Sequence, residues 1–139
     1  NCSKSMINVH QKYKASVMAS MQVNKSTVSR WGIYNLSKRL SKSDYLISDV
    51  VEKPSIKDAP SNKAVIGRYI LPKTIFKKLK NQNSVNGGEI HITDAIQSLI
   101  KDNENFIAHN FSGKYLDCGT MNGYINSGKK ISNLWNYAW

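Results

Sequence analysis

Two places in this chain combine side chains that could carry out chemistry on a polar ligand. Glu52-Lys53 places a carboxylate beside an ammonium at the end of an apolar run, and Asn62 follows after a short linker. Farther along, Asp117 begins an Asp-Cys-Gly segment. Carboxylate and amide oxygens accept hydrogen bonds from hydroxyls, and a lysine offers a point charge to a phosphate, so these residue types suit a sugar phosphate. A Mg²⁺ ion that bridges phosphates uses one or two carboxylates, which makes Asp117 a candidate ligand.

Gly32 is a further candidate, at the centre of the apolar segment Trp31-Gly-Ile-Tyr34. A glycine within a strand often permits the close approach of a ligand, although it also marks β-bulges. The other candidates have structural interpretations too. Glu52 and Asn62 fit a solvated connection between two core strands, and an Asp two residues before a Gly fits a turn. The residue types alone leave both interpretations open.

Several familiar motifs do not occur in these 139 residues. The sequence has no Gly-x-Gly-x-x-Gly fingerprint, no P-loop and no Gly-x-Ser-x-Gly elbow. Its histidines are not at metal-ligand spacings, so we interpret them as ordinary polar or partly buried residues: His10, His91 and His109.

The composition indicates one globular domain, with 139 residues, 40% hydrophobic and 21% charged. No apolar run approaches the roughly 20 residues of a membrane span, so we expect no membrane partner. Cys2 and Cys118 form no Cys-x-x-Cys pair, which favours a reducing, cytoplasmic location.

The net charge of +11 raises the question of nucleic-acid binding. Only three of the 20 basic residues are arginines, and the lysines are spread along the chain in short clusters. A nucleic-acid surface favours arginine with interleaved aromatic residues, so a solvated lysine-rich surface is the better interpretation and we expect no specific nucleic-acid partner. A basic nucleic-acid-binding module remains an alternative, which predicts tight and steeply salt-dependent binding.

The hydrophobic periodicity predicts the elements that must position the candidates. The expected helices cover residues 2–14, the segment after Pro72, a segment N-capped by Thr93, and a final stretch from Met121 to Trp135 that is interrupted near Gly128. The expected strands are 15–23, 31–34, 45–52, 64–71, 106–111 and 114–119, with a helical turn capped by Asn24 or Ser26 and a hairpin loop at 36–43. This order predicts an α/β layered domain with a mixed sheet, in which Glu52, Lys53 and Asn62 lie at strand ends.

Five segments in the same order resemble the bacterial UTP–glucose-1-phosphate uridylyltransferases, over roughly residues 2 to 125. They are Lys14-Ala-Ser-Val-Met18; Val28-Ser-Arg-Trp-Gly-Ile33; Val51-Glu-Lys-Pro followed by Ala59-Pro-Ser-Asn-Lys-Ala-Val-Ile-Gly-Arg-Tyr-Ile-Leu71; Gly87-Gly-Glu-Ile-His-Ile-Thr-Asp-Ala-Ile96; and Phe111-Ser-Gly-Lys-Tyr-Leu-Asp-Cys-Gly119 continued by Gly123-Tyr124. The resemblance implies a nucleotidyltransferase with a Rossmann-like mixed sheet. Such an enzyme joins glucose 1-phosphate to UTP, forms UDP-glucose and releases pyrophosphate.

The resemblance also implies roles for individual residues. Gly32 would pack on the sugar, and the Glu52 carboxylate would accept hydrogen bonds from glucose hydroxyls. Lys53 would contact phosphate and is the candidate catalytic residue, because phosphoryl-type transfer is mostly positioning and charge neutralisation. Two residues would lie beside the sugar, Asn62 and Val65. Asp117 resembles the second Mg²⁺ ligand of related sugar nucleotidyltransferases.

The chain also departs from the family pattern. The family's nucleotide loop, Gly-x-Gly-Thr-Arg-x-Leu-Pro, is not found in these residues. We therefore expect an incomplete, C-terminal half of the domain: 1–125 would be the sugar-phosphate-binding part and 126–139 a divergent tail. The C-terminal helix of this family helps subunits pair, so the expected partners are a second copy or a separate N-terminal half. The alternative is a non-catalytic remnant, whose half-sheet would have an exposed edge and an uncovered face.

Overall fold

A computed structural model describes residues 1–82 and 90–134 of the chain, and the strands in that part form one closed sheet. The strands are β1 (Ser16–Gln22), β2 (Gly32–Arg39), β3 (Asp44–Glu52), β4 (Lys63–Ile70) and β5 (Phe106–Asn110). Their order is β1-β4-β2-β3-β5, and β5 pairs back onto β1. The β1–β5 pair is parallel and the other pairs are antiparallel, so the predicted α/β fold with a mixed sheet is confirmed.

The closure of the sheet corrects one expectation. Each described strand has a neighbour on both sides, so the exposed edge expected of a half-domain is not found among these strands. Full closure removes the unpaired backbone groups that make sheet edges prone to aggregation.

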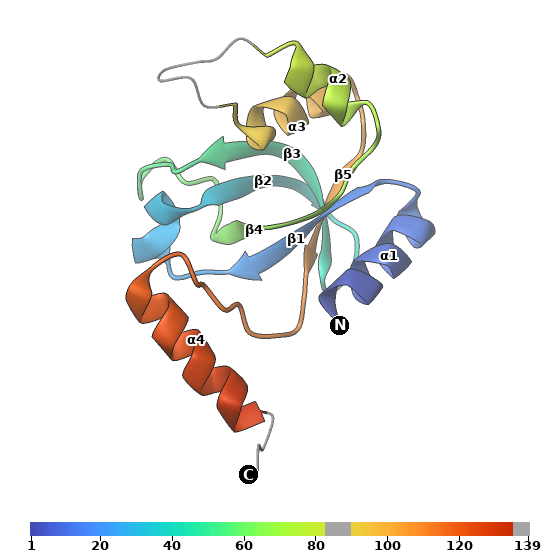
Figure 1. Cartoon of the computed structure of the whole chain (residues 1–139). Coiled ribbons are helices and arrows are strands. Elements are labelled where there is room, and N and C mark those ends of the chain that lie inside the picture. The colour runs from blue at the N-terminus through green and yellow to red at the C-terminus, as the bar shows by residue number, and fades with distance from the viewer. Residues whose placement is uncertain (83–89, 135–139) are drawn as a thin grey trace.

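Four α-helices are described, and all but the last lie against the barrel or against each other (Figure 1). They are α1 (Cys2–Tyr13), α2 (Ile75–Lys80), α3 (Ile92–Lys101) and α4 (Met121–Leu134), with a 3₁₀ helix η1 (Lys25–Arg30) between β1 and β2. Helix α1 packs against β1 and β4 through the buried Met6 and Val9, as its apolar spacing predicts. Helix α3 packs on β3, and α2 packs beside α3. The larger core cluster lies under these two helices and includes Met18, Tyr34 and Phe106.

Strand β1 is buried on both faces, which its sequence pattern does not predict. The alternation in this segment predicts one polar face, yet Ser16 and Ser20 are only 8% and 1% exposed. Val17 belongs to the cluster under α1, and Met18 belongs to the core on the other side. Since β1 pairs with both β4 and β5 and has packed layers above and below, its serines are buried with the rest of the strand.

Four local predictions are wrong. Strand β2 continues through Arg39 into the segment predicted as loop, because Arg39 still pairs with Tyr45 of β3 even though its side chain is exposed. Residues 114–119 form no strand. Helix α3 begins at Ile92 with His91 as its N-cap, so Thr93 lies inside the helix and is not the cap. Helix α4 runs through Gly128 without interruption: a glycine weakens a solvent-facing helix by about 1 kcal/mol but does not have to break it.

The cap of the 3₁₀ helix is predicted correctly, since the Asn24 side chain accepts a hydrogen bond from the Ser26 N–H at 3.2 Å. Helix α4 extends away from the strands in Figure 1. Met121 and Tyr124 at its start are exposed. The segment 83–89 and the tail residues 135–139 lie outside the described part; the first of these holds most of the asparagine-rich segment 81–88, which the sequence predicts to be a loop.

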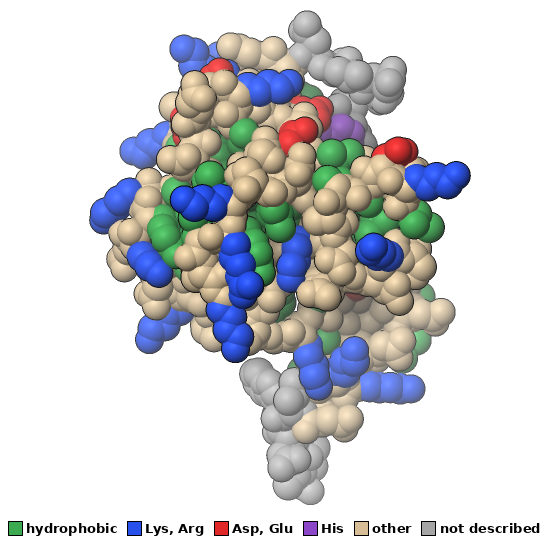
Figure 2. All heavy atoms as spheres, turned by 180° about the vertical axis from the view of Figure 1, so that it is seen from behind, with side chains coloured by type: hydrophobic (Ala, Val, Ile, Leu, Met, Phe, Trp, Pro, Cys, Tyr) green, Lys and Arg blue, Asp and Glu red, His purple; other side chains and the backbone are tan. Residues whose placement is uncertain are grey.

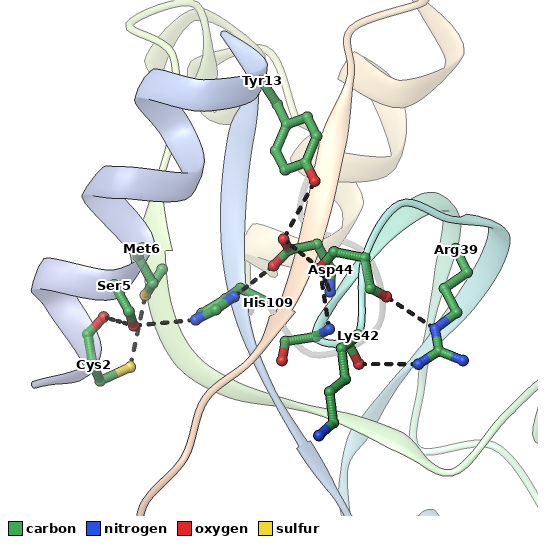
Figure 3. Close-up of polar contacts among 10 residues, drawn as sticks. Cys2, Ser5, Met6, Tyr13, Arg39, Lys42, Asp44 and His109 are labelled. Atoms are coloured by element: carbon green, nitrogen blue, oxygen red, sulfur yellow. Dashed lines mark hydrogen bonds and ion pairs between the residues drawn. The ribbon is translucent and has the colours of Figure 1, made fainter.

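A buried polar cluster ties α1 to the start of β3 and to β5 (Figure 3). The His109 Nδ1 and the Asp44 Oδ1 are 2.7 Å apart, and both residues are buried. The other carboxylate oxygen of Asp44 accepts a hydrogen bond from Ser41 Oγ at 2.7 Å. His109 Nε2 lies 3.1 Å from the hydroxyl of Ser5 on α1. His109 is thus a satisfied core histidine, as its lack of a metal-ligand spacing suggested.

The surface is rich in lysine, and Figure 2 shows Lys and Arg side chains distributed over the whole of the face in view. This distribution agrees with a solvated basic surface. Among the described helices, none is both long and apolar enough to cross a membrane.

Candidate functional site

Three of the candidate residues come together at one cavity of about 290 Å³, at the ends of the central strands. They are Gly32, the first residue of β2; Glu52, the last residue of β3; and Val65 on β4. The cavity is also lined by Arg30, Trp31, Gly67, Tyr69, His91, Ile92 and Thr93. Its volume is close to the lower limit of typical small-molecule sites, about 300 Å³, and so fits a sugar better than a whole nucleotide sugar.

Strand pairing explains why these residues meet. Gly32 and Glu52 are register partners across the antiparallel β2–β3 pair. Ile33 pairs with Ala64 across β2–β4, which places Val65 beside them. A small buried cluster of Val28, Ile33 and Ala64 lies under this junction. The strand ends are therefore fixed by backbone pairing and by packing.

Gly32 has a specific steric role at the cavity. A Cβ at this position would lie 2.9 Å from the Glu52 Oε2 and 3.2 Å from the Val65 Cγ2. Only a glycine leaves the Glu52 carboxylate where it is. The atom that lies closest to this position is thus an oxygen of the chain's own carboxylate, and the approach of a ligand to Gly32 stays a prediction.

Glu52 is exposed at the cavity and forms no hydrogen bond or ion pair within residues 1–82 and 90–134. Tyr69 lines the same cavity. Burial and, to a lesser degree, the Glu52 carboxylate raise the pKa of the Tyr69 phenol. The phenol therefore stays protonated at neutral pH and can donate a hydrogen bond. The cavity offers an uncommitted carboxylate together with a neutral donor, which is the polar set that a polyhydroxylated ligand requires.

Lys53 and Asn62 do not line this cavity. Lys53 follows Glu52 directly, is exposed, and has a left-handed backbone with φ 45° that is held by the Lys53 N–H to Trp31 carbonyl bond of 3.0 Å. Asn62 lines a second hollow of about 360 Å³ together with Lys25 and Lys57. Both residues therefore lie at strand ends as predicted, but the structure does not place Asn62 with Glu52.

Asp117 lies in the irregular segment after β5, and its Oδ1 accepts the Gly119 N–H at 3.0 Å. This is the turn geometry that an Asp before a Gly favours. An edge-to-face contact of Tyr115 with Trp31, centroids 5.5 Å apart, joins the segment to the cavity wall. Burial, and secondarily the Asp117 carboxylate, raises the pKa of the Tyr115 phenol.

The described part of the chain holds no group of three or more His, Cys, Asp or Glu residues arranged for a metal. A single carboxylate nevertheless fits Mg²⁺, which commonly uses one or two carboxylates with substrate phosphates and waters. Asp117 meets that requirement because its Oδ2 accepts no hydrogen bond from the described residues.

Several lining residues were missed by the sequence reasoning, although one signal was present. Val65, Gly67 and Tyr69 alternate along β4 and all line the cavity, as residues on one face of a strand must. That period of two would have added Tyr69 to the candidates once Val65 was among them. Arg30, His91 and Thr93 reach the cavity from η1 and α3, and no local pattern predicts that.

The fold is an α/β domain with a polar cavity where β2 begins and β3 ends, and the comparisons give its family. The nucleotidyl transferase family model matches residues 3–133, so the chain belongs to that family. A UTP–glucose-1-phosphate uridylyltransferase of Pseudomonas aeruginosa is 40% identical over 122 residues, which are 88% of this chain and 43% of that protein. A putative enzyme of the same name from Methanocaldococcus jannaschii is 36% identical over 131 residues, 94% of this chain and 46% of that protein.

Solved structures agree with this family assignment. An apo UDP-glucose pyrophosphorylase superposes with a TM-score of 0.90 at 40% identity, over 96% of this chain and 48% of that one. A UDP-glucose pyrophosphorylase in complex with UDP-glucose gives a TM-score of 0.87 at 40% identity, over 96% of this chain and 50% of that one. The chain thus spans about half the length of the relatives that it matches.

Proposed function

We propose that this chain provides the sugar-phosphate-binding part of a UTP–glucose-1-phosphate uridylyltransferase, the C-terminal half of a bacterial enzyme that forms UDP-glucose and pyrophosphate from UTP and glucose 1-phosphate. The observation that carries the proposal is the convergence of Gly32, Glu52 and Val65 on one cavity. The relatives named for this activity and for a UDP-glucose complex support it. The free thiols Cys2 and Cys118 fit a cytoplasmic location.

In this proposal each residue has a distinct task. Glu52 accepts hydrogen bonds from sugar hydroxyls, Gly32 gives the ring room to approach, and Val65 contacts its apolar face. The Lys53 ammonium, next to Glu52, neutralises the phosphate. Asn62 borders the neighbouring hollow, where it would meet a more distant part of the ligand. Residues 1–125 would form the sugar-phosphate-binding part and residues 126–139 a divergent tail.

Asp117 is the residue that would hold Mg²⁺. The ion would supply charge neutralisation at the phosphates, which is a principal source of rate in such transfers. The UTP-binding loop would come from outside these residues, either from a separate N-terminal half or in a larger assembly that includes a second copy. The chain by itself should bind without turnover.

Calorimetric titration with glucose 1-phosphate and with UDP-glucose, each with and without Mg²⁺, tests the proposal. Removal of a carboxylate that accepts from sugar hydroxyls costs about 1.5–3 kcal/mol, so Glu52→Gln should weaken glucose 1-phosphate about 10- to 100-fold. Asp117→Asn should remove the Mg²⁺ dependence and leave metal-free binding unchanged. The matched control is Asp102→Asn, since Asp102 pairs at the surface with Lys78.

Two results would separate the alternatives. A folded, monodisperse wild-type chain that binds neither ligand would favour the non-catalytic remnant over the proposed half-site. Formation of UDP-glucose by the 139-residue chain alone would show instead that no partner half is required.

A further inference from the structure

A second cavity lies near the other end of β3, beside the buried pair of His109 and Asp44 (Figure 3). It has a volume of about 210 Å³, and both Ser5 and His109 line it. Asp44 begins β3 and Glu52 ends it, so this cavity is separate from the one at Glu52. The proposed function gives no task in ligand binding to the residues around it.

Three side chains from three elements lie in a row at this second cavity. Ser5 Oγ on α1 lies 3.1 Å from His109 Nε2 on β5, and His109 Nδ1 lies 2.7 Å from Asp44 Oδ1 at the start of β3. A hydroxyl within reach of an imidazole, whose other nitrogen is held by a carboxylate, is the arrangement of a serine nucleophile, its base and an orienting acid. Such a set is recognised by its geometry, so the missing Gly-x-Ser-x-Gly motif does not bear on it.

The carboxylate decides which nitrogen of His109 can act as a base. Ionised Asp44 only accepts hydrogen bonds, so it holds the proton of the neutral imidazole on Nδ1. The lone pair of Nε2 is then available to the Ser5 hydroxyl. That hydroxyl also lies 2.8 Å from the carbonyl of Cys2, one turn earlier in α1. Its single proton therefore has two acceptors, and transfer requires the hydroxyl to turn from Cys2 to His109.

Burial and access are divided among the three side chains. Asp44 and His109 are 6% and 9% exposed, which keeps water away from their pairing, whereas Ser5 is partly exposed and borders the cavity. The cavity is smaller than the roughly 300 Å³ of typical small-molecule sites, so it fits a short acyl group. Three further lining residues are of types that donate hydrogen bonds to an oxygen that becomes negative: Ser43, Asn110 and Ser112.

We propose that Ser5 is the nucleophile of a second site on this chain, which hydrolyses esters of short carboxylic acids, with His109 as the base and Asp44 as its positioning residue. The Ser5 Oγ bonds to the acyl carbon while its proton passes to His109 Nε2. The bond from the acyl carbon to the ester oxygen breaks, and the alcohol leaves with that proton. Water then attacks the acyl group on Ser5 and gives a proton to Nε2. The carboxylic acid leaves as Ser5 regains its proton.

The site is independent of the proposed function, because it shares no residue with the sugar-phosphate site. The same contacts attach α1 to β3 and β5, so the cluster has a structural role as well. Failure of the chain to bind glucose 1-phosphate would leave this proposal untouched, and the reverse holds too.

Labelling with a fluorophosphonate tests the nucleophile, because this reagent bonds to an activated serine with loss of fluoride. Peptide mass spectrometry should find the phosphonyl group on Ser5 of the wild-type chain. With p-nitrophenyl acetate, the chain should release a burst of about one equivalent of p-nitrophenol as the acyl-enzyme forms. Ser5→Ala should lose both the label and the burst. Ser3→Ala, at an exposed serine of the same helix, is the matched control and should keep both.

Two results would overturn the proposal. The first is a folded wild-type chain, as judged by circular dichroism, whose Ser5 carries no label. The second is a burst of the same size in Ser5→Ala, which would assign the reaction with the ester to surface lysines. The position of the label is read on the wild-type chain, so the test does not depend on the stability of a variant.

The pH dependence of labelling separates positioning by Asp44 from a purely structural role. The rate should fall in acid, where His109 carries a proton on both nitrogens and cannot act as a base. Asp44→Asn removes a charge that favours the protonated imidazole, so this decline should shift to lower pH, and the maximal rate should fall about 100-fold or more. A decline at the wild-type pH would show that Asp44 does not position the base. Other titratable groups near the pair remain in this variant: Tyr13 and Lys12 beside Asp44, and Cys2 at the cavity.

Discussion

The two ends of strand β3 each carry a carboxylate, in contrasting surroundings. Asp44, the first residue, is 6% exposed and has a hydrogen-bond partner on each oxygen, His109 and Ser41. Glu52, the last residue, is exposed and has no hydrogen-bond partner among the described residues. Eight residue steps separate them, or roughly 26 Å of strand.

The difference indicates what each end is for. A buried carboxylate must be paired to remain stable in the fold, so the Asp44 end holds α1, β3 and β5 together. The Glu52 carboxylate lies beside a cavity, and the missing Cβ of Gly32 leaves room for it, so this end of the strand suits the proposed ligand. On the proposed function, the same strand thus has a structural end at Asp44 and a binding end at Glu52. Substitutions at the two ends should affect different measurements.

The largest effect should come from the structural end. Asp44→Ala leaves His109 and Ser41 without their partner in a buried site, and breaking a buried pair of this kind costs about 3 kcal/mol or more. We expect a corresponding fall in the free energy of unfolding by urea. Asp102→Ala is the matched control, because the exposed Asp102–Lys78 pair should contribute less than about 1 kcal/mol. Equal losses in the two variants would contradict a structural role for the Asp44 cluster.

At the Glu52 end of β3, Gly32→Ala should weaken ligand binding strongly and change the stability of the fold little. The new Cβ would displace the Glu52 carboxylate, so glucose 1-phosphate should bind about 10- to 100-fold more weakly in a calorimetric titration. The atom that must move ends a flexible side chain, so the unfolding free energy should change by about 1 kcal/mol or less. In the control Gly128→Ala, the added Cβ meets open space on α4, which should raise stability by about 1 kcal/mol and leave binding unchanged. Unaltered binding by Gly32→Ala would remove the steric argument for Gly32.

The sequence pointed to the residues that meet at the cavity, but not to the pair at the other end of β3. Glu52 at the end of an apolar run, and Gly32 inside another, are local signals, and adjacent strands bring them together. The Asp44–His109 pair joins residues 65 positions apart, through pairing of β3 with β5 that no local pattern contains. The pairing of β1 with β5, which closes the barrel, also joins residues far apart in the sequence, so no local pattern predicts it either.

Other errors arose where tertiary structure overrides a local rule. The polar segment after Asn35 looks like a loop, yet backbone pairing continues there because exposed side chains do not prevent a hairpin from forming. Thr93 has the residue type of a cap, but the extended backbone at His91 sets the helix start two residues earlier. The alternation through Ser16 and Ser20 predicts a solvent face, which β1 does not have because α1 packs on one side of it and the larger core cluster lies on the other.

Tyr34 lies on β2 in the larger core cluster, and its ionisation makes the stability of the fold depend on alkaline pH. Burial raises the pKa of Tyr34 well above its usual value, and its hydroxyl donates to the Ala19 carbonyl at 2.9 Å. Above about pH 10 the unfolded chain loses this proton while the folded chain keeps it, so stability falls as pH rises towards the folded pKa.

Tyr34→Phe should cost about 1 kcal/mol at pH 7, from the lost hydrogen bond, and should make the decline above pH 10 shallower. Urea unfolding at pH 7 and between pH 10 and 11 measures both effects. Tyr124→Phe, at an exposed position on α4, should leave the pH profile as it is in the wild type. If the unfolding free energy of Tyr34→Phe fell with pH as steeply as that of the wild type, the raised pKa of Tyr34 would not be the cause of the decline.

The smallest expected effect is on stability, and it comes from replacing Lys53 by glycine. A comparison with Lys14 separates the backbone strain at Lys53 from a role in binding. Lys53 and Lys14 both have left-handed backbones, with φ of 45° and 51°, a conformation that costs a non-glycine residue about 1 kcal/mol. Lys14 ends α1, away from the cavity, and Lys53 adjoins Glu52. Lys53→Gly and Lys14→Gly should therefore each raise the free energy of unfolding by about 0.5–1 kcal/mol, after the added flexibility of the unfolded chain is subtracted.

Only one of these two variants should weaken ligand binding. If the Lys53 ammonium neutralises the sugar phosphate, Lys53→Gly should lower the affinity for glucose 1-phosphate, and the difference from the wild type should shrink at high salt. Lys14→Gly removes the same charge from a distant site and should bind as the wild type does. Equal binding by both variants would mean that the Lys53 ammonium does not contact the phosphate. The left-handed backbone of Lys53 would then have only the structural role of ending β3 beside Trp31.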